Sequence, residues 1–292
     1  MDERLRSIVA RLLAAEPASS RPVEGGYTHN VRRVVTLADG RTAFVKAAVD
    51  ELSAEWLRSE HRAYSALSSA PFLPRLLGWA DDGKRPVLVL EDLSGAVWPP
   101  PWTHEYVEAV LTALRQVAAT PPPRGLPSLE EEREELSGWR TVEREPGPFL
   151  GIGLCTPAWL AKALPVFRAA EEACVLDGSS LLHLDVRSDN ICFLGDQAML
   201  VDWNHAAVGN PELDVAAWLP SLHAEGGPAP DAVIAAAPEA AAFWCGFFAA
   251  RAGLSPPATA PHARDVQLAQ LRSALPWAAR ALGLPSPVDH VP

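Results

Sequence analysis

The stretch LLHLDVRSDNICFL, residues 181–194, constrains this chain more than any other segment. It is apolar at both ends, yet its middle carries four ionisable residues, His183, Asp185, Arg187 and Asp189, followed by the amide of Asn190. Burying ionisable groups without partners is costly. These residues therefore either form a solvated turn between two strands or are held in place for chemistry.

Length and charge limit the classes of protein to consider. The chain has 292 residues, which is enough for one large domain or two lobes, and 48% of them are hydrophobic. Its net charge of −11 argues against a nucleic-acid partner, because such binders rely on neutralising phosphates. An acidic surface fits a cationic substrate, and solubility alone explains it equally well.

Cysteine usage and the N-terminus both predict a cytoplasmic protein. The four cysteines form no CxxC pair and no zinc-ligand spacing, so a reducing compartment is the simplest account. Residues 1–17 begin with acidic side chains and lack the long apolar region of a signal peptide. No segment is long enough to span a membrane, so we expect no membrane partner.

Residues 1–92 predict a small α+β lobe. After an amphipathic helix, apolar runs flank the dipeptide D-G in ADGR, which is a strong hairpin signal. Residues 53–69 show helical spacing with Ser53 as a plausible N-cap, and residues 72–93 predict two more strands around DDGK. The expected order is helix, strand, strand, helix, strand, strand.

Residues 93–292 predict a larger, mostly helical lobe with one exception. Helical patterns cover 104–119 and much of the chain after residue 156. Within 181–202, however, ICFL and AMLVDW bracket GDQ, which predicts a third hairpin. Antiparallel pairing would bring the two ends of that hairpin, Asn190 and Asp202, together.

An ordered set of residues carries a family resemblance. In chain order the set is a strand lysine, a helix glutamate, the pattern H-x-D-x4-N and an aspartate after a short strand: Lys46, Glu60, His183, Asp185, Asn190 and Asp202. This order resembles the protein-kinase-like phosphotransferases. LLHLDVRSDNICF and LVDWNHAAVGNPELDVAAWL resemble most closely the aminoglycoside phosphotransferase family and relatives such as choline and homoserine kinases. The resemblance spans about residues 22–223 and implies a bilobal kinase-like α+β fold. Its nucleotide-binding lobe would cover 1–92 and its catalytic, substrate-binding lobe 93–292.

The resemblance implies roles for the polar residues of the opening stretch. Asp185 would take the proton of the substrate hydroxyl, while Asn190 and Asp202 would hold Mg²⁺, which prefers oxygen ligands. Arg187 is either a phosphate-contacting helper or one half of a surface salt bridge. His183 and Asp214 would brace the loop.

The resemblance also implies a nucleotide site in the first lobe. Lys46 would contact the phosphates and be oriented by Glu60. The segment EGGYTHN lacks G-x-G-x-x-G, and its candidate phosphate-contacting residues are Gly25, Gly26, Thr28 and Asn30. The base would meet backbone groups of the inter-lobe hinge: Glu91, Asp92 and Leu93.

These residues predict an ATP- or GTP-dependent, Mg²⁺-assisted O-phosphotransferase. Its partners would be a nucleoside triphosphate and a small alcohol, with an aminoglycoside or another amino alcohol as the leading class. The alternative is a non-enzymatic nucleotide- or metabolite-binding protein on the same fold, although no core catalytic position is missing. A protein kinase is disfavoured, because GNPELD follows Asp202 so soon that no activation loop fits. The sequence leaves the donor nucleotide, the acceptor hydroxyl and the oligomeric state open.

Overall fold

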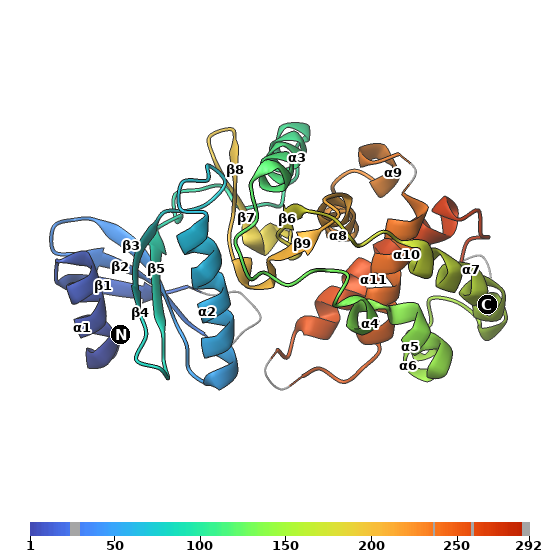
Figure 1. The fold of residues 1–292 in the computed structure, drawn as a ribbon, viewed down its shortest axis with the longest axis horizontal. Helices are drawn as coiled ribbons and strands as arrows, with labels where there is room; N and C mark the ends of the chain where they lie inside the picture. Colours follow the sequence, from blue (N-terminus) through green and yellow to red (C-terminus); the bar gives the residue numbers. More distant parts are fainter. Residues whose placement is uncertain (24–29, 236, 258–259, 288–292) are drawn as a thin grey trace. The chain divides into compact units, whose positions relative to one another are not determined.

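The fold is described from a computed structural model, which covers all residues except 24–29, 236, 258–259 and 288–292 (Figure 1). The backbone contacts group the chain into two compact units. The first unit comprises Met1–Pro99 and Asp189–Ala206, and the second comprises Pro100–Ser188 and Ala207–Pro292. The predicted lobes, 1–92 and 93–292, stay a prediction.

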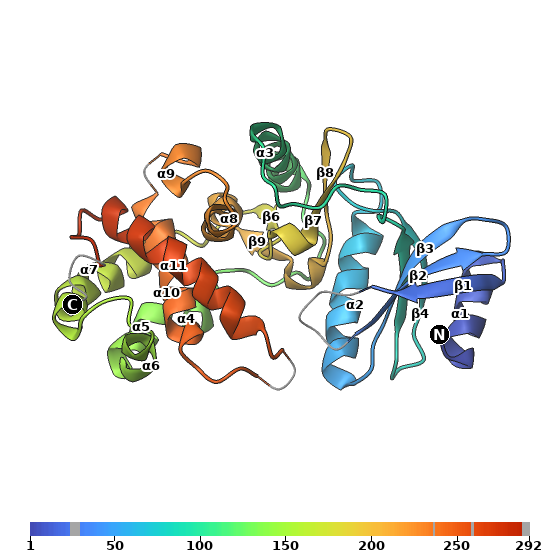
Figure 2. The ribbon, with the colours of Figure 1, turned by 180° about the vertical axis from the view of Figure 1, so that it is seen from behind.

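The first unit contains a five-stranded antiparallel sheet between two helices. Its strands are β1 (Pro17–Pro22), β2 (Val31–Leu37), β3 (Thr42–Ala47), β4 (Leu76–Ala80) and β5 (Val87–Glu91). They lie in the order β1-β2-β3-β5-β4. The helices α1 (Glu3–Leu13) and α2 (Glu51–Ala66) lie on opposite sides of the sheet (Figures 1 and 2). Both hairpins predicted for this region are confirmed.

Strand β1 was not predicted. Its sequence, PASSRP, has a proline at each end and no alternation of apolar and polar residues. It occupies an edge of the sheet, where a missing backbone N–H is tolerated. Edge strands of this kind give little sequence signal because only one neighbour and few buried side chains define them.

The side chains of the sheet alternate between a core face and an opposite face. On the core face, Val35, Val45 and Val89 pack with Leu5 and Val9 of α1 in one buried cluster. The opposite face carries the intervening residues of the same strands, and the strand register places them side by side: Val34 opposite Phe44, Phe44 opposite Leu90, and Arg32 opposite Lys46. The alternation therefore leaves one face of the sheet for a ligand site.

Helix α2 begins at a capping box. The carboxylate of Asp50 accepts the backbone N–H of Ser53 at 2.8 Å, and the Ser53 hydroxyl accepts the backbone N–H of Asp50 at 3.0 Å. The prediction of Ser53 as N-cap is wrong, because Ser53 is the third residue of the helix and answers the cap. From this start, helical spacing brings Leu57, Glu60 and Tyr64 onto the buried side of the helix.

The third predicted hairpin is confirmed and belongs to the first unit. Its strands are β7 (Ile191–Leu194) and β8 (Gln197–Leu200). The N–H of Val201 donates to the carbonyl of Asn190 at 2.9 Å, which closes the open end of the hairpin. The N–H of Leu200 donates to the carbonyl of Phe72 at 2.8 Å and ties the hairpin to the rest of the unit.

The second unit is mostly helical. Its helices are α3 (His104–Ala119), α4 (Arg133–Leu136), α5 (Gly138–Arg144), α6 (Gly147–Gly151), α7 (Pro157–Ala173), α8 (Glu212–Ala224), α9 (Pro230–Val233), α10 (Pro238–Ala252) and α11 (Ala263–Ala281). A short ladder pairs β6 (Ser180–Leu182) with β9 (Ala207–Gly209). Helix α10 packs against α5, α7, α8 and α11 and forms the centre of the unit.

Helices α5 and α10 cross at backbone contact. A Cβ atom at Gly138 would lie 1.7 Å from the carbonyl oxygen of Gly246, so only glycine fits there. The buried carboxylate of Glu171 accepts the backbone N–H of Trp139 at 2.8 Å, while Arg168 donates to it at 2.9 Å. Within the described residues, no helix is long and apolar enough to cross a membrane.

Candidate functional site

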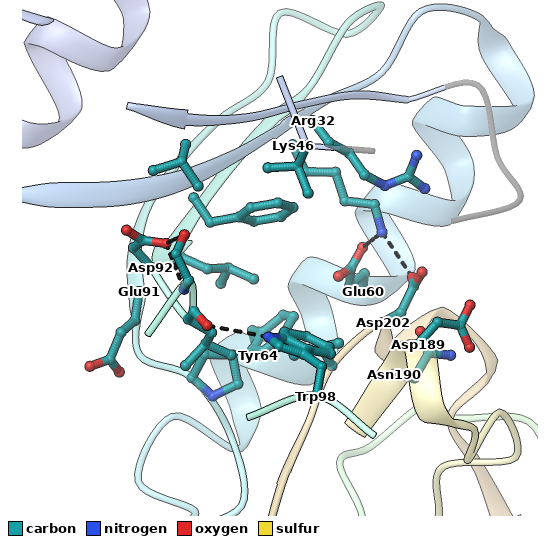
Figure 3. A pocket seen from close by; sticks show the side chains of 18 of the residues that line it. Arg32, Lys46, Glu60, Tyr64, Glu91, Asp92, Trp98, Asp189, Asn190 and Asp202 are labelled. Atoms are coloured by element: carbon teal, nitrogen blue, oxygen red, sulfur yellow. Dashed lines mark hydrogen bonds and ion pairs between the residues drawn. The ribbon is translucent and has the colours of Figure 1, made fainter. Parts of the chain in front are cut away.

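A cavity of about 450 Å³ opens on the face of the sheet that carries Arg32, Phe44 and Lys46 (Figure 3). The described residues that line it all belong to the first unit. Its volume lies within the usual range for small-molecule sites. Among the residues that the structure describes, seven of the predicted site residues line it: Lys46, Glu60, Glu91, Asp92, Leu93, Asn190 and Asp202.

A shared ammonium group lies at one end of this cavity. The Nζ of Lys46 is 2.7 Å from Oε2 of Glu60 and 2.8 Å from Oδ1 of Asp202. Lys46 and Glu60 are almost fully buried, whereas the Asp202 side chain keeps 24% of its surface exposed. The lysine comes from β3, the glutamate from α2 and the aspartate from the residues after β8, so three elements hold the group in place.

Burial and ion pairing set the charges of this cluster. Burial alone would lower the pKa of Lys46, but the charges of Asp202 and Glu60 outweigh it and the pKa is raised. Burial likewise opposes the Asp202 carboxylate, yet the contact with Lys46 leaves its pKa lowered. For Glu60 burial dominates and raises the pKa to about 7, against the attraction of Lys46. Lys46 and Asp202 are therefore charged at neutral pH, and Glu60 responds to pH near 7.

The end of the β7–β8 hairpin offers oxygen ligands that fit Mg²⁺. The Asp202 carboxylate accepts the Lys46 ammonium through Oδ1, despite burial its pKa is lowered by that contact, and the residue lines the cavity. Asn190 also lines the cavity, and its backbone carbonyl accepts the N–H of Val201. No group of three or more His, Cys, Asp or Glu in the described part of the chain could hold a metal ion. Two protein ligands suit Mg²⁺, which keeps several waters and takes phosphate oxygens as further ligands.

The second unit contains the loop predicted to be catalytic. Asp214, buried at the start of α8, accepts the backbone N–H of His183 through Oδ2 and that of Leu184 through Oδ1, both at 2.7 Å. The N–H of Asp185 donates to Nδ1 of His183 at 3.2 Å. Leu184 adopts a left-handed conformation, with φ of 62°. The bracing that the resemblance implied for His183 and Asp214 matches these contacts.

Arg187 and Asp185 form an ion pair that includes a hydrogen bond from Nη2 of Arg187 to Oδ2 of Asp185. Nε lies 3.2 Å from Oδ1, and Nη2 lies 3.2 Å from Oδ2. Their side chains are 16% and 23% exposed, so the pair is largely covered. The hydrogen bond is charge-assisted and holds the Asp185 carboxylate against the guanidinium.

A comparison with protein families matches residues 19–256 to the phosphotransferase enzyme family, abbreviated APH. The chain belongs to this family. It is therefore a small-molecule phosphotransferase, as the order of its polar residues had predicted. No curated protein matches the chain at a significant level.

Solved structures of such enzymes share the fold of this phosphotransferase. A spectinomycin phosphotransferase in complex with ADP and spectinomycin superposes with a TM-score of 0.66 at 9% identity, covering 97% of this chain and 99% of that one. A choline/ethanolamine kinase family protein from Mesorhizobium loti gives 0.59 at 15% identity, with 96% and 97% covered. An aminoglycoside phosphotransferase from Alicyclobacillus acidocaldarius gives 0.55 at 17% identity, with 95% and 92% covered. At these identities the likeness shows the fold, and the predicted kinase-like α+β class is confirmed.

The predicted hinge of the phosphotransferase forms the far end of the cavity. The Glu91 side chain forms an ion pair with Arg75, whose Nε lies 3.2 Å from Oε2 of Glu91. Asp92 accepts the N–H of Ser94 at 2.9 Å. The N–H of Leu93 has no hydrogen-bond partner among the described residues, while its carbonyl accepts the N–H of Ala96. Backbone groups here, rather than side chains, are available to the edge of a base.

The glycine segment of the phosphotransferase is only partly described. Gly25, Gly26 and Thr28 lie outside the described residues. Asn30 directly precedes β2 and is half-buried. Their predicted roles as phosphate contacts stay predictions.

Sequence reasoning missed several lining residues of the cavity. Arg21, Arg32, Phe44 and Trp98 contribute to its wall, and Asp189, interpreted from the sequence as a turn residue, lines it as well. Arg32 had a detectable signal, because an arginine occupies the ligand-side position of β2 opposite Lys46. For Trp98, in a proline-rich connection, the sequence contained no comparable signal.

Proposed function

We propose that this phosphotransferase moves the terminal phosphate of ATP or GTP to a hydroxyl group of a small molecule, assisted by Mg²⁺. The observation that carries the proposal is the buried Lys46 ammonium, shared by Glu60 and Asp202 at the end of the cavity. An ammonium held in this way can contact nucleotide phosphates without being neutralised by burial, and one adjacent carboxylate remains ionised. Phosphoryl transfer needs this kind of positioning and charge more than covalent chemistry.

The predicted site residues of the first unit would hold the nucleotide donor. Asn190 and Asp202 would bind Mg²⁺, and Glu60 would orient Lys46 toward the phosphates. Bound Mg²⁺ would neutralise charge that develops on the transferring phosphate. The N–H of Leu93 would meet the base at the opposite end of the cavity.

Asp185 would accept the proton of the acceptor hydroxyl. A carboxylate accepts hydrogen bonds and serves as a general base for a hydroxyl proton. Arg187, which is ion-paired with Asp185, would contact the transferring phosphate through its guanidinium.

An amino alcohol is the acceptor class that we favour. The solved structures of similar fold include spectinomycin, aminoglycoside and choline/ethanolamine enzymes, whose acceptors carry cationic nitrogen groups. The net charge of −11 suits such acceptors.

A cytoplasmic location is consistent with four buried cysteines that carry no disulfide.

A nucleotide-consumption screen tests the proposal. The purified protein is incubated with ATP or GTP and Mg²⁺ against aminoglycosides, aminocyclitols, choline, ethanolamine, amino acids and nucleosides. We expect acceptor-dependent release of nucleoside diphosphate, abolished by EDTA. Tight nucleotide binding without turnover on any acceptor would instead favour a non-enzymatic binding protein.

A further inference from the structure

We propose that Arg32 is a second phosphate-binding cation of the cavity and makes nucleotide affinity depend on the number of phosphates. The inference rests on the proposed function, since it concerns how the same cavity holds its donor. It assigns a role to a side chain that the sequence did not single out.

The strand register places Arg32 beside Lys46. The two residues are direct partners on the antiparallel strands β2 and β3, so their side chains emerge on the same face of the sheet. Both line the cavity, and Arg32 is half-buried. Figure 3 shows its guanidinium near the Lys46 ammonium, on the opposite side of the cavity from Asp92.

Two cations directly opposite each other on one sheet face are unfavourable without an anion between them. Glu60 and Asp202 partly supply that anion by binding Lys46. Burial has the largest influence on the pKa of Lys46, Glu60 and Asp202, and the charge of Arg32 lowers the pKa of each in addition. The positive charge of Arg32 therefore acts on the Lys46 ammonium and on the two carboxylates that bind it.

The charges around the cavity explain why a second cation is needed. Among the described lining residues, five are acidic and three are basic. Lys46 shares its charge with two of these carboxylates, Glu60 and Asp202. A triphosphate entering this cavity would meet excess negative charge unless Arg32 and a metal ion offset it.

The chemistry of arginine suits this position. A guanidinium presents several N–H donors in a planar fork that matches phosphate oxygens, whereas a lysine acts as a point charge. The sequence has no G-x-G-x-x-G before β2. Arg32 would supply side-chain donors instead.

Nucleotide binding to the full chain tests the inference. Affinities for ATP, ADP, AMP and inorganic tripolyphosphate are measured by calorimetry in EDTA, for the natural protein, Arg32→Ala and Arg33→Ala. Arg33 is a matched control because it is the same residue type on the same strand, one position away, and bonds Ser20 on β1. Thermal unfolding of each variant shows whether the fold is retained.

The expected pattern is a loss that grows with the number of phosphates. Arg32→Ala should weaken ATP and tripolyphosphate about 10- to 100-fold and AMP less than about 3-fold, because charge-assisted hydrogen bonds to phosphate are lost. Arg33→Ala should leave all four within about 2-fold. Arg32→Lys, which keeps the charge but not the fork, should lie in between.

Two results would overturn the inference. Unchanged ATP affinity in Arg32→Ala would show that Arg32 does not contact phosphates. An equal loss for AMP and ATP, with a lowered melting temperature, would show that Arg32 only balances the carboxylates. Failure of the natural protein to bind any nucleotide in a parallel titration with Mg²⁺ would instead refute the proposed function itself.

Discussion

The two units hold buried carboxylates in different ways. In the first unit Glu60 and Asp202 share the ammonium of Lys46. In the second unit Asp214 accepts two backbone N–H groups, and the structure records no ion pair for it among the described residues. A side-chain cation can rearrange toward an incoming phosphate, whereas backbone donors cannot leave without distorting the chain. The first arrangement therefore suits ligand binding, and the second suits holding a loop.

Both arrangements are joined to unusual backbone. Asp202 and Leu184 each adopt a left-handed conformation, with φ of 66° and 62°. Residues other than glycine enter this region at a cost, and such positions concentrate at functional sites. Asp202 belongs to the carboxylate cluster of the first unit, and Leu184 of the second unit donates its backbone N–H to Asp214. In both units a left-handed residue therefore takes part in holding a buried carboxylate.

The largest expected effect separates the two units by function. Asp185→Asn should lower kcat about 10²- to 10⁴-fold, because the substrate hydroxyl loses its proton acceptor. The Kd for nucleotide should change less than about 3-fold, since the described residues that line the donor cavity belong to the first unit. Steady-state kinetics and calorimetry measure the two quantities. Asp196→Asn in the exposed turn of the β7–β8 hairpin is the control, and an equal loss of nucleotide affinity would contradict the division.

The second effect concerns the carboxylates held by charge. Lys46→Met should lower the free energy of unfolding by about 3–5 kcal/mol at pH 7, because two buried acidic groups lose their shared cation. The loss should shrink at pH 5, where Glu60, with a pKa raised to about 7 by burial, is protonated. Urea titration measures both. Lys84→Met, at an exposed turn, should change stability by less than about 0.5 kcal/mol. A loss that is the same at both pH values would argue against charge as its cause.

The smallest expected effect is a pH dependence of the free energy of unfolding that arises from Asp214 in the second unit. Burial raises the pKa of Asp214 to about 6 from its usual 3.8, so the native state holds a proton that the unfolded chain has released. The bound proton adds about 3 kcal/mol to the free energy of unfolding below about pH 4. This stabilisation is lost as the pH rises through 6. Asp214→Asn does not titrate, so its stability relative to the natural protein should rise across that window. Urea titrations from pH 4 to 7 measure the difference, with Asp196→Asn as control, and a flat or falling difference would refute it.

Much of the local structure was predictable because its signals lie within a few residues. The three hairpins follow from apolar runs around D-G or G-D turns, and the helix at 104–119 follows from the spacing of apolar residues. The cap of α2 was misplaced because both Asp50 and Ser53 are good capping residues, and only the backbone decides which one precedes the first turn.

The sequence by itself determined which chemistry this chain could hold. Its order of lysine, glutamate, H-x-D-x4-N and aspartate predicted a phosphotransferase, and the family comparison confirmed it. The tertiary structure decided how the charges combine: Lys46 meets an aspartate 156 positions further along the chain, and Arg32 faces the same cavity. Periodicity and turn signals act between near neighbours, whereas contacts over such separations depend on the packing of whole elements. That packing assigns one ammonium to two carboxylates and places a guanidinium on the same face of the sheet.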